Sequence, residues 1–525
     1  IGDDSDSITQ AAKYGDSTRT SDKSNKAGGS GGAFYFANAS GGSDKFAINL
    51  YGGTIAYNCA ANNGGAFYLK SGNLTVQGAQ IKYNGASGDS DKGGGAIFLD
   101  ACSKLHLDGC TIAGNECYNS AMGGAIYVLG DYDTARTPKT FLKGAVSIPS
   151  NGLQKNDICL KCYNYTGVWL QDPLLYIEGT LTGSEPVATI TIAPVVTMYR
   201  SDRQVLALAD GVTDVNFPLQ CYKFAVTPQA SVSPAQEWAV AGDGYLAPVT
   251  TLTGTSIDGF TVADFNEGDK VIYVFDASVN NTQIEVFTEK LYHKTTNNNP
   301  DGKTVGEGSV LDFSKVTNLT SLGFNWSNNS IAQPFDIILP PKFDATKFTG
   351  QTFATSIRNA KNVIATPMAN GGLVSEDGIV YNKPKTTLFF YPGGKTATSF
   401  VVPNGVTTIP RHSFSCNSSL KNITLPEGVT SIAWETCWGT SIESINVPST
   451  VKTIANEAFS NSASFTSLTF ANPNGWKLGP DQSTAVEIAP SNLSDPTTAA
   501  TWYKANAYNV SGATNSNGYK VLWHD

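Results

Sequence analysis

Gly64-Gly65-Ala66-Phe67-Tyr68-Leu69 is the stretch that decides the fold, because it is one of four copies of a six-residue pattern. Successive copies start 33, 30 and 29 residues apart. The other three are Gly31-Gly32-Ala33-Phe34-Tyr35-Phe36, Gly94-Gly95-Ala96-Ile97-Phe98-Leu99 and Gly123-Gly124-Ala125-Ile126-Tyr127-Val128. A unit of about 30 residues is too small to bury its apolar face alone, so such units are expected to stack on one another.

Two further blocks recur between these copies. One alternates apolar residues with others and ends in glycine, which is typical of a strand: Ile48-x-Leu50-x-Gly52, Leu74-x-Val76-x-Gly78 and Leu105-x-Leu107-x-Gly109. The other ends in asparagine: Ile55-x-x-Asn58, Ile81-x-x-Asn84, Ile112-x-x-Asn115 and a weaker Ile148-x-x-Asn151. Three short strands per unit predict a parallel β-helix, whose alternate apolar residues form ladders inside a shared core.

The corners of this helix are expected to need two kinds of structural residue. Paired glycines allow left-handed turns without steric cost, and asparagines can stack as an amide ladder that bonds to the neighbouring backbone. The residues concerned are Gly64, Gly65, Gly94, Gly95, Gly123, Gly124, Asn58, Asn84 and Asn115. The pattern resembles the passenger repeats of the polymorphic outer-membrane protein family, which carry GGA-I and F-x-x-N motifs. This chain departs from the second motif, with Ile where that family has Phe.

A second repeat system lies near the C-terminus. Its units read apolar-x-apolar-Pro, then Val, then Ile, then Phe or Cys, and the prolines Pro403, Pro426 and Pro448 are spaced 23 and 22 residues apart. This period falls within the range of leucine-rich repeats, about 20–29 residues. Over about 375–470, this sequence pattern resembles the BspA-like leucine-rich repeat of spirochaete and oral-bacterial surface proteins. The resemblance implies a curved parallel stack and a surface location, and some members of that family are adhesins.

The regions between and around the repeats are less periodic. Residues 166–293 are expected to continue the β-helix or to form a bridging β domain, and 294–374 to hold a linker and a degenerate repeat around Ile337–Pro340. Six aromatic residues after position 471 indicate a folded cap, with one short helix over 495–504. The fold class is thus an all-β repeat protein, with these parts: 1–30 arm or cap, 31–165 β-helix, 166–293 β-rich region, 294–374 linker and degenerate repeat, 375–470 leucine-rich repeats and 471–525 cap.

Composition and charge exclude several classes of protein. The chain has 525 residues, a net charge of −9 and only 15% charged residues. No basic patch stands out, which argues against a nucleic-acid partner. No run of 18 apolar residues predicts a transmembrane helix. The first residue is Ile1, so the chain is expected to be the mature product of an exported protein.

The sequence shows few signs of catalytic or metal chemistry. Its nine cysteines include one Cys-x-x-Cys, at Cys159–Cys162, without the second pair or the histidines that a zinc site needs. We expect buried thiols with one or two disulfides, no cofactor, no metal and no enzyme. The rival interpretation is a carbohydrate-active β-helix enzyme, whose candidate carboxylates are Asp89, Asp91, Asp100 and Asp108. His106 is expected to point outward without a role.

The leucine-rich repeats offer a definable binding surface. If Leu420, Ile423 and Leu425 point inward, their neighbours form a polar sheet face. The candidate binding residues are Lys421, Asn422, Thr424, Glu443, Ser444, Asn446, Thr466, Ser467 and Thr469. Trp434 and Trp438 are either a small aromatic site or, as favoured, core filling.

We interpret the chain as an exported bacterial protein, at the cell surface or associated with the outer membrane. It is expected to mediate adhesion by binding a host or bacterial surface protein or a glycan. Self-assembly into a surface layer or extracellular filament is the alternative, because an uncapped β-helix end can pair with a neighbour.

Overall fold

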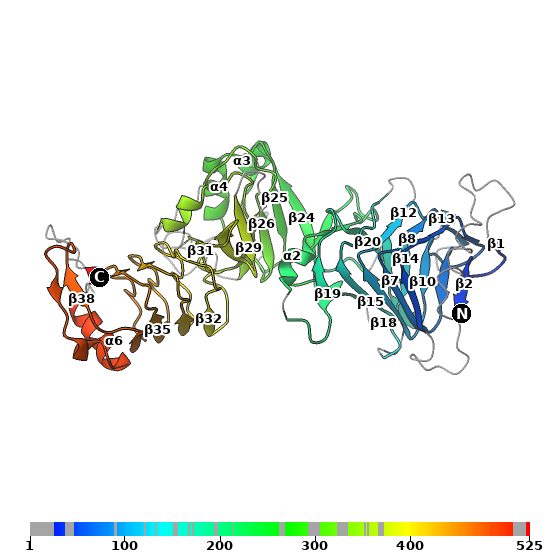
Figure 1. Ribbon diagram of the computed structural model, residues 1–525. Helices are drawn as coiled ribbons and strands as arrows, with labels where there is room; N and C mark the ends of the chain where they lie inside the picture. Colours follow the sequence, from blue (N-terminus) through cyan, green and yellow to red (C-terminus); the bar gives the residue numbers. More distant parts are fainter. Residues whose placement is uncertain are drawn as a thin grey trace. The chain divides into compact units, whose positions relative to one another are not determined.

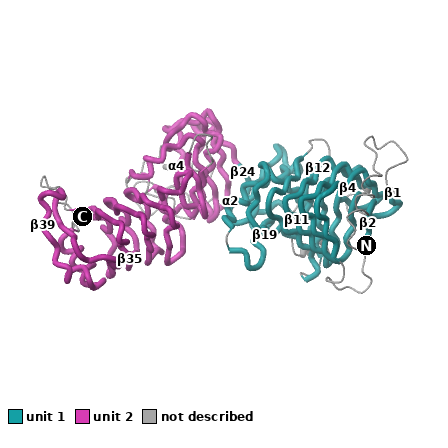
Figure 2. The backbone as a smooth tube through the Cα atoms, in the orientation of Figure 1, with its two compact units in different colours: residues 1–249 teal, residues 250–525 magenta. Residues whose placement is uncertain are grey.

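The structure is a computed structural model of the whole chain. It describes residues 26–36, 47–88, 92–119, 122–131, 133, 135–150, 156–165, 168–170, 173–193, 198–213, 215–261, 268–291, 305–322, 334–350, 353, 356–365, 372–507 and 521–524. The first 25 residues, the Asp89–Asp91 corner, Asn151 and the proposed linker at 294–302 therefore lie outside the described residues. The chain divides into two compact units, 1–249 and 250–525 (Figure 2).

Unit 1 is a stack of parallel strands around one apolar core (Figure 1). One sheet runs in the order β2 (Phe34–Phe36), β6 (Phe67–Leu69), β10 (Ile97–Leu99), β14 (Ile126–Leu129), β16 (Ile158–Lys161), β20 (Ala188–Ala193) and β22 (Phe224–Val226). A second runs in the order β21 (Leu206–Leu208), β19 (Leu175–Leu181), β15 (Lys139–Gly144), β11 (Ser103–Asp108), β7 (Gly72–Gln77) and β3 (Ala47–Tyr51). All strand pairs within these two sets are parallel, so the predicted parallel β-helix is confirmed.

Two shorter sheets complete each turn. The third sheet contains β12 (Thr111–Ala113), β8 (Gln80–Lys82) and β4 (Thr54–Ala56), and the fourth contains β1 (Lys26–Ala27), β5 (Cys59–Ala60), β9 (Gly85–Gly88) and β13 (Glu116–Asn119). The sequence indicated three strands per turn, and the structure has a fourth directly after each corner asparagine. These four strands are short and rich in small or polar residues, so they lack the alternation that marks a strand in sequence.

The β-helix continues well beyond residue 165, because β20 and β22 extend the first sheet and β19 and β21 extend the second. Of the two possibilities for 166–293, continuation therefore holds as far as Val226. Unit 1 also contains the hairpin β17 (Tyr163–Tyr165) and β18 (Val168–Leu170), the helix α2 (Phe217–Cys221) and the strand β23 (Trp238–Val240). β23 pairs antiparallel with β24 (Leu246–Leu252), which begins in unit 1 and ends in unit 2.

The first half of unit 2 is another parallel stack. It consists of β25 (Ile272–Phe275), β26 (Ser309–Asp312), β27 (Phe335–Ile338) and β28 (Ala360–Ile364), with α3 (Gly254–Gly259), α4 (Asn281–Glu289) and the short 3-10 helix η2 (Ala345–Thr349). Phe287 of α4 packs edge-on against Phe275 of β25 in one core. The described part of 294–374 is thus packed repeat structure, and the degenerate unit around Ile337 is one of its strands.

The second half of unit 2 contains the leucine-rich repeats. A hairpin sheet, β29 (Leu373–Glu376), β30 (Ile379–Asn382) and β31 (Leu388–Phe390), precedes them. The four parallel strands β32 (Ser399–Val401), β33 (Asn422–Thr424), β35 (Ser444–Val447) and β37 (Ser467–Phe470) form one side of the coils. The other side contains β34 (Ser431–Ile432) and β36 (Thr453–Ile454), and all these coils share one core.

A cap covers the last coil, as the aromatic-rich tail predicts. β40 (Val521–His524) pairs antiparallel with β36, and β38 (Trp476–Gly479) and β39 (Val486–Glu487) extend that sheet. After the 3-10 helix η3 (Pro490–Asn492) comes α6 (Pro496–Asn506), capped by the Asp495 carboxylate, which accepts from Thr498 N at 2.8 Å. Tyr503 of α6 donates its hydroxyl to Ala455 O, 2.8 Å away, and so fixes the helix on the last coil.

Candidate functional site

The solvent face of the β32–β33–β35–β37 sheet is the surface that the sequence proposed for binding. Leu420, Ile423 and Leu425 are buried, so the residues between them face outward. The strand register aligns the nine candidates in three rows across the sheet. These rows are Lys421–Glu443–Thr466, Asn422–Ser444–Ser467 and Thr424–Asn446–Thr469.

Contacts within this face are few and local. Lys421 Nζ lies 2.9 Å from Glu443 Oε1, and both side chains are nearly half exposed. Ser444 donates its hydroxyl to Asn422 Oδ1 on the neighbouring strand. Thr424 is exposed, and beside it on β32 lies Val401, which is 69% exposed. The face therefore offers hydroxyl and amide groups, one ion pair and one exposed apolar side chain to a partner.

Asn446 differs from its neighbours on this face. Its Oδ1 accepts from Leu425 N at 2.6 Å, and its Nδ2 donates to Leu425 O at 3.0 Å. The side chain is half-buried and its amide links β35 to the end of β33. Asn446 thus has a structural role that the exposure pattern alone did not indicate.

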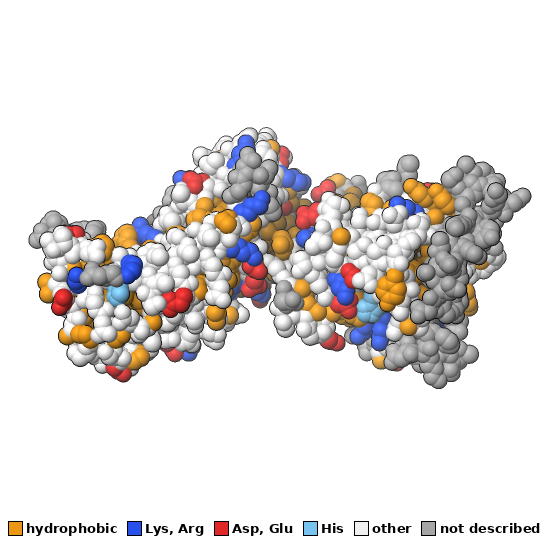
Figure 3. Space-filling model, viewed as in Figure 1, with side chains coloured by type: hydrophobic (Ala, Val, Ile, Leu, Met, Phe, Trp, Pro, Cys, Tyr) orange, Lys and Arg blue, Asp and Glu red, His pale blue; other side chains and the backbone are white. Residues whose placement is uncertain are grey.

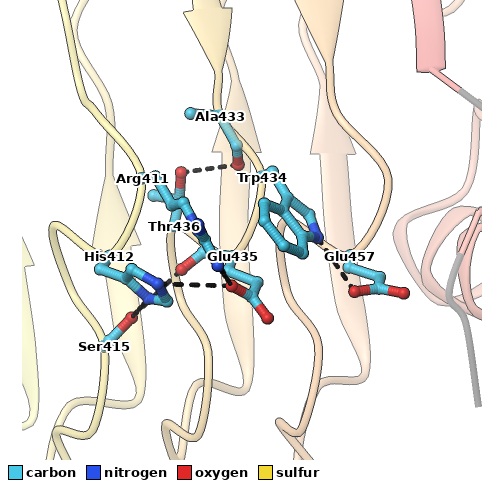
Figure 4. Close-up of polar contacts among 8 residues, drawn as sticks. All are labelled: Arg411, His412, Ser415, Ala433, Trp434, Glu435, Thr436 and Glu457. Carbon is cyan, nitrogen blue, oxygen red and sulfur yellow. Dashed lines mark hydrogen bonds and ion pairs between the residues drawn. The ribbon is translucent and has the colours of Figure 1, made fainter. Parts of the chain in front are cut away.

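The corner after the second strand of each coil contains a polar network that the sequence did not predict (Figure 4). His412, Glu435 and Glu457 occupy the same position in three successive coils, and all three have left-handed backbones, with φ of 63°, 51° and 55°. Backbone bonds connect the corners, since His412 N donates to Glu435 O and Glu435 N donates to Glu457 O. Left-handed residues other than glycine cost about 1–2 kcal/mol each, so the repeated geometry is held by the coil and not by the residue type.

Side chains join these corners across the coils. Arg411 donates from Nε to Glu435 Oε2 at 3.0 Å, and its guanidinium lies 3.7 Å from the centroid of the Trp434 ring. Trp434 Nε1 in turn donates to Glu457 Oε2 at 2.9 Å (Figure 4). Trp434 is half-buried and lies outside the apolar core, so the favoured interpretation of core filling is wrong for it. The network binds three coils together by charge-assisted bonds and a cation–π contact.

His412 is completely buried beneath this network. His412 Nδ1 lies 3.0 Å from the Ser415 hydroxyl, which is also 3.1 Å from Glu435 O, and His412 Nε2 lies 3.3 Å from Glu435 Oε2. Burial, helped by the charge of Arg411, lowers the pKa of His412 to about 4.

In unit 1, the predicted structural residues divide into two roles. Gly64, Gly94 and Gly123 have φ of 65°, 68° and 68° and make the left-handed turn. Gly65 and Gly95 serve close packing between coils instead, since a Cβ would lie 2.1 Å from Gly95 O and 2.3 Å from Gly124 O, respectively.

The corner asparagines form the expected ladder. Asn84 Oδ1 accepts from Asn58 N at 3.0 Å and from Asn58 Nδ2 at 2.9 Å, and Asn115 repeats this arrangement toward Asn84. The fourth member is Asn156, whose Oδ1 accepts from Asn115 N at 3.2 Å. The sequence had suggested Asn151 for this place. The error arose because an insertion lengthens the corner, so the spacing after Ile148 no longer marks the residue.

The remaining candidates show little that resembles a reaction centre. Asp100 accepts a hydrogen bond from the Tyr68 hydroxyl at 2.8 Å. His106 points outward, as expected, where it stacks on Phe141 and lies near Glu178. No disulfide joins the nine cysteines, which lie within the described residues, contrary to the expectation of one or two. Among the described residues, no three His, Cys, Asp or Glu side chains gather in a way that would hold a metal ion.

Comparison with known proteins agrees with the second repeat system. Residues 389–475 match the family described as "BspA type Leucine rich repeat region", in six copies. The chain therefore carries BspA-type leucine-rich repeats in this segment, as the prolines predicted. No curated protein is significantly similar to the chain.

Three solved structures are distantly similar. A leucine-rich repeat protein from Eubacterium ventriosum is 18% identical, with 45% of this chain and 70% of that chain covered and a TM-score of 0.25. The pneumococcal vaccine antigen PcpA is 11% identical, with coverages of 85% and 76% and a TM-score of 0.21. A leucine rich cell surface protein from Faecalibacterium prausnitzii is 14% identical, with coverages of 71% and 91% and a TM-score of 0.20.

Proposed function

We propose that this chain is an exported surface protein that binds a protein partner through the solvent face of its leucine-rich repeats. The observation that supports this most is the alignment of exposed Asn422, Thr424 and Thr469 in register over a fully buried apolar layer. Such a face is held rigid from behind, so little side-chain and backbone freedom is lost when a partner docks. The family resemblance of the repeats supports the surface location. No helix among the described residues is long and apolar enough to cross a membrane.

The opposite corner of the same coils supports the choice of the sheet face. There, Arg411, Trp434 and Glu457 use their polar groups on one another. On the sheet face, the exposed residues Thr424 and Thr469 lie in the same row as the exposed Val401. A protein interface combines such an apolar contact with surrounding hydrogen-bonding groups.

A matched pair of threonines tests the proposal. Thr424 lies on the proposed face, and Thr430, six residues later in the same coil, is equally an exposed threonine but lies outside that sheet. We expect Thr424→Arg to lower the affinity of the purified chain for its partner at least tenfold, because a long charged side chain at the centre of an interface blocks close packing. Thr430→Arg should bind like the wild type.

The measurement is biolayer interferometry against a panel of matrix proteins, mucins and bacterial surface proteins. Both variants should keep the wild-type melting temperature, since both positions are exposed. Failure of every panel member to bind, or equal binding by the two variants, would contradict the proposal. The alternatives, a structural filament subunit and a carbohydrate-active enzyme, rest on the sequence alone, as does the resemblance of the glycine repeats to the polymorphic outer-membrane proteins.

A further inference from the structure

The outer face of the six-stranded sheet of unit 1 carries a ridge of stacked rings. His106 on β11, Phe141 on β15 and Tyr176 on β19 occupy one column of the strand register. The His106 and Phe141 rings are 4.5 Å apart and nearly parallel, and the Phe141 and Tyr176 rings are 5.2 Å apart. Because the rings face one another along the stack, their edges point to solvent. Aromatic edges carry positive partial charge, which favours contact with oxygen atoms.

A chain of hydrogen-bonding groups runs beside this ridge across four strands. Gln77 donates from Nε2 to Asp108 Oδ2 at 3.2 Å, and Lys143 Nζ lies 4.0 Å from the same oxygen. Lys143 Nζ is also 3.7 Å from Glu178 Oε2, and Glu178 Oε1 is 3.3 Å from His106 Nδ1. Figure 3 shows basic, acidic and histidine side chains gathered on this face of unit 1.

These groups alternate donors with acceptors and hold one another in place. The Asp108 and Glu178 carboxylates are each 29% exposed, so both keep oxygen lone pairs that can accept further bonds. Lys143 keeps donor capacity for the same reason. A ligand rich in hydroxyl groups both donates and accepts, and therefore matches such a chain. The mutual contacts reduce the freedom that the side chains would lose on binding.

Lys139 adds a charge on the other side of the ridge. It lies on the same face of β15 as Phe141 and Lys143, two residues before Phe141. Its Nζ is 5.6 Å from the centroid of the Tyr176 ring, and no carboxylate among the described residues pairs with it. The chain as a whole has a net charge of −9. A lysine without a carboxylate partner, beside groups that can bind hydroxyls, therefore stands out from the overall charge of the chain. It is complementary to an anionic group on a ligand.

We propose that this face of unit 1 binds a carboxylate-bearing oligosaccharide. Its sugar hydroxyls bond to the Gln77–Asp108–Lys143–Glu178–His106 chain, and a uronic acid carboxylate pairs with Lys139. The ring edges of Phe141 and Tyr176 lie between this chain of hydrogen-bonding residues and Lys139. This site lies on a different unit from the leucine-rich repeat face and takes a different class of ligand.

The test measures binding of a galacturonic acid hexamer to the full chain by titration calorimetry, with the fully methyl-esterified hexamer as a neutral ligand of equal length. We expect the acid to bind and the ester to bind about tenfold more weakly, the size of one charge-assisted bond. Lys139→Gln should weaken binding of the acid by the same factor, and Lys139→Arg, which keeps the charge, should restore most of it. Lys342→Gln replaces an exposed lysine of unit 2 that belongs to neither proposed surface. It serves as the control and should leave binding of the acid hexamer unchanged.

Three results would overturn the proposal: no binding of the acid hexamer, equal affinity for acid and ester, or an unchanged affinity in Lys139→Gln. Circular dichroism of each variant establishes that the fold is retained. Because the leucine-rich repeat face is tested with Thr424→Arg and a protein panel, this site and the proposed function fail or succeed separately.

Discussion

The two solenoids of this chain stabilise their corners in different ways. In unit 1 the same residue, asparagine, stands at each corner and each amide bonds to the next: Asn58, Asn84, Asn115 and Asn156. In the leucine-rich repeats the corresponding links join unlike side chains, Arg411 to Trp434 and Glu435, and Trp434 to Glu457. Neighbouring coils can thus be joined either by bonds between identical residues or by bonds between unlike residues. Only the identical residues produce a repeat that can be recognised in the sequence.

The largest effect is expected from breaking the ladder of identical residues. Asn84 is fully buried, and its amide bonds to the side chains of Asn58 and Asn115 and to Ile55 O and Lys82 O. Asn84→Ala leaves several of these groups buried without partners, at about 1–3 kcal/mol for each such group. We expect a loss of about 4 kcal/mol in the unfolding free energy of unit 1, measured by urea denaturation. The exposed Asn49→Ala is the control and should change stability by less than about 0.5 kcal/mol.

The stability of the leucine-rich repeats is instead expected to fall at low pH, because of His412 at their corner. The pKa of His412, about 4 in the folded chain, lies below its ordinary value of 6.5, so the unfolded state takes up this proton first. Stability from this group is therefore complete above pH 6.5 and falls as the pH drops toward 4. The shift corresponds to about 3 kcal/mol at pH 4.

The measurement is the urea midpoint of unit 2 between pH 7 and pH 4. His412→Asn keeps a side chain that tolerates the left-handed backbone and cannot take up the proton. It should remove most of this part of the pH dependence. An identical slope in wild type and variant would show that His412 is not the group responsible.

Removing Trp434 should have a smaller effect, because it is half-buried and its contacts are at the edge of the solvent. Trp434→Ala deletes the ring beneath Arg411 and the donor to Glu457. We expect a loss of about 2 kcal/mol, from a cation–π contact and one charge-assisted bond. Trp434→Phe keeps the ring without the indole N–H and should recover about half. Equal losses in the two variants would mean that the hydrogen bond to Glu457 alone links these coils.

The sequence predicted what repetition encodes. The glycine pairs, the first three corner asparagines and the Pro-x-x-Val-x-x-Ile units recur at similar spacings, and the strands they mark are present. It did not predict the contacts between unlike residues. His106 and Glu178 are 72 residues apart in the chain, and they meet because their strands, β11 and β19, both pair with β15. Likewise, Arg411 and Trp434 occupy equivalent positions in successive coils, but neither residue type predicts that their side chains are in contact. A periodic sequence pattern therefore predicts the backbone of a solenoid more reliably than it predicts the contacts between its side chains.

The smallest effect on stability is expected on the sheet face proposed for binding. Lys421 and Glu443 form an ion pair of 2.9 Å, but both side chains are largely in solvent, at 49% and 44% exposure. Exposed pairs of this kind contribute about 0–1 kcal/mol, so Lys421→Ala should lower the unfolding free energy by less than about 0.5 kcal/mol. An exposed ion pair that contributes so little to folding can vary with the partner while the coils beneath it stay intact. If Lys421→Ala instead destabilised unit 2 as much as Trp434→Ala does, the face would be a structural element like the corner, and the division between a binding side and a locking side would not hold.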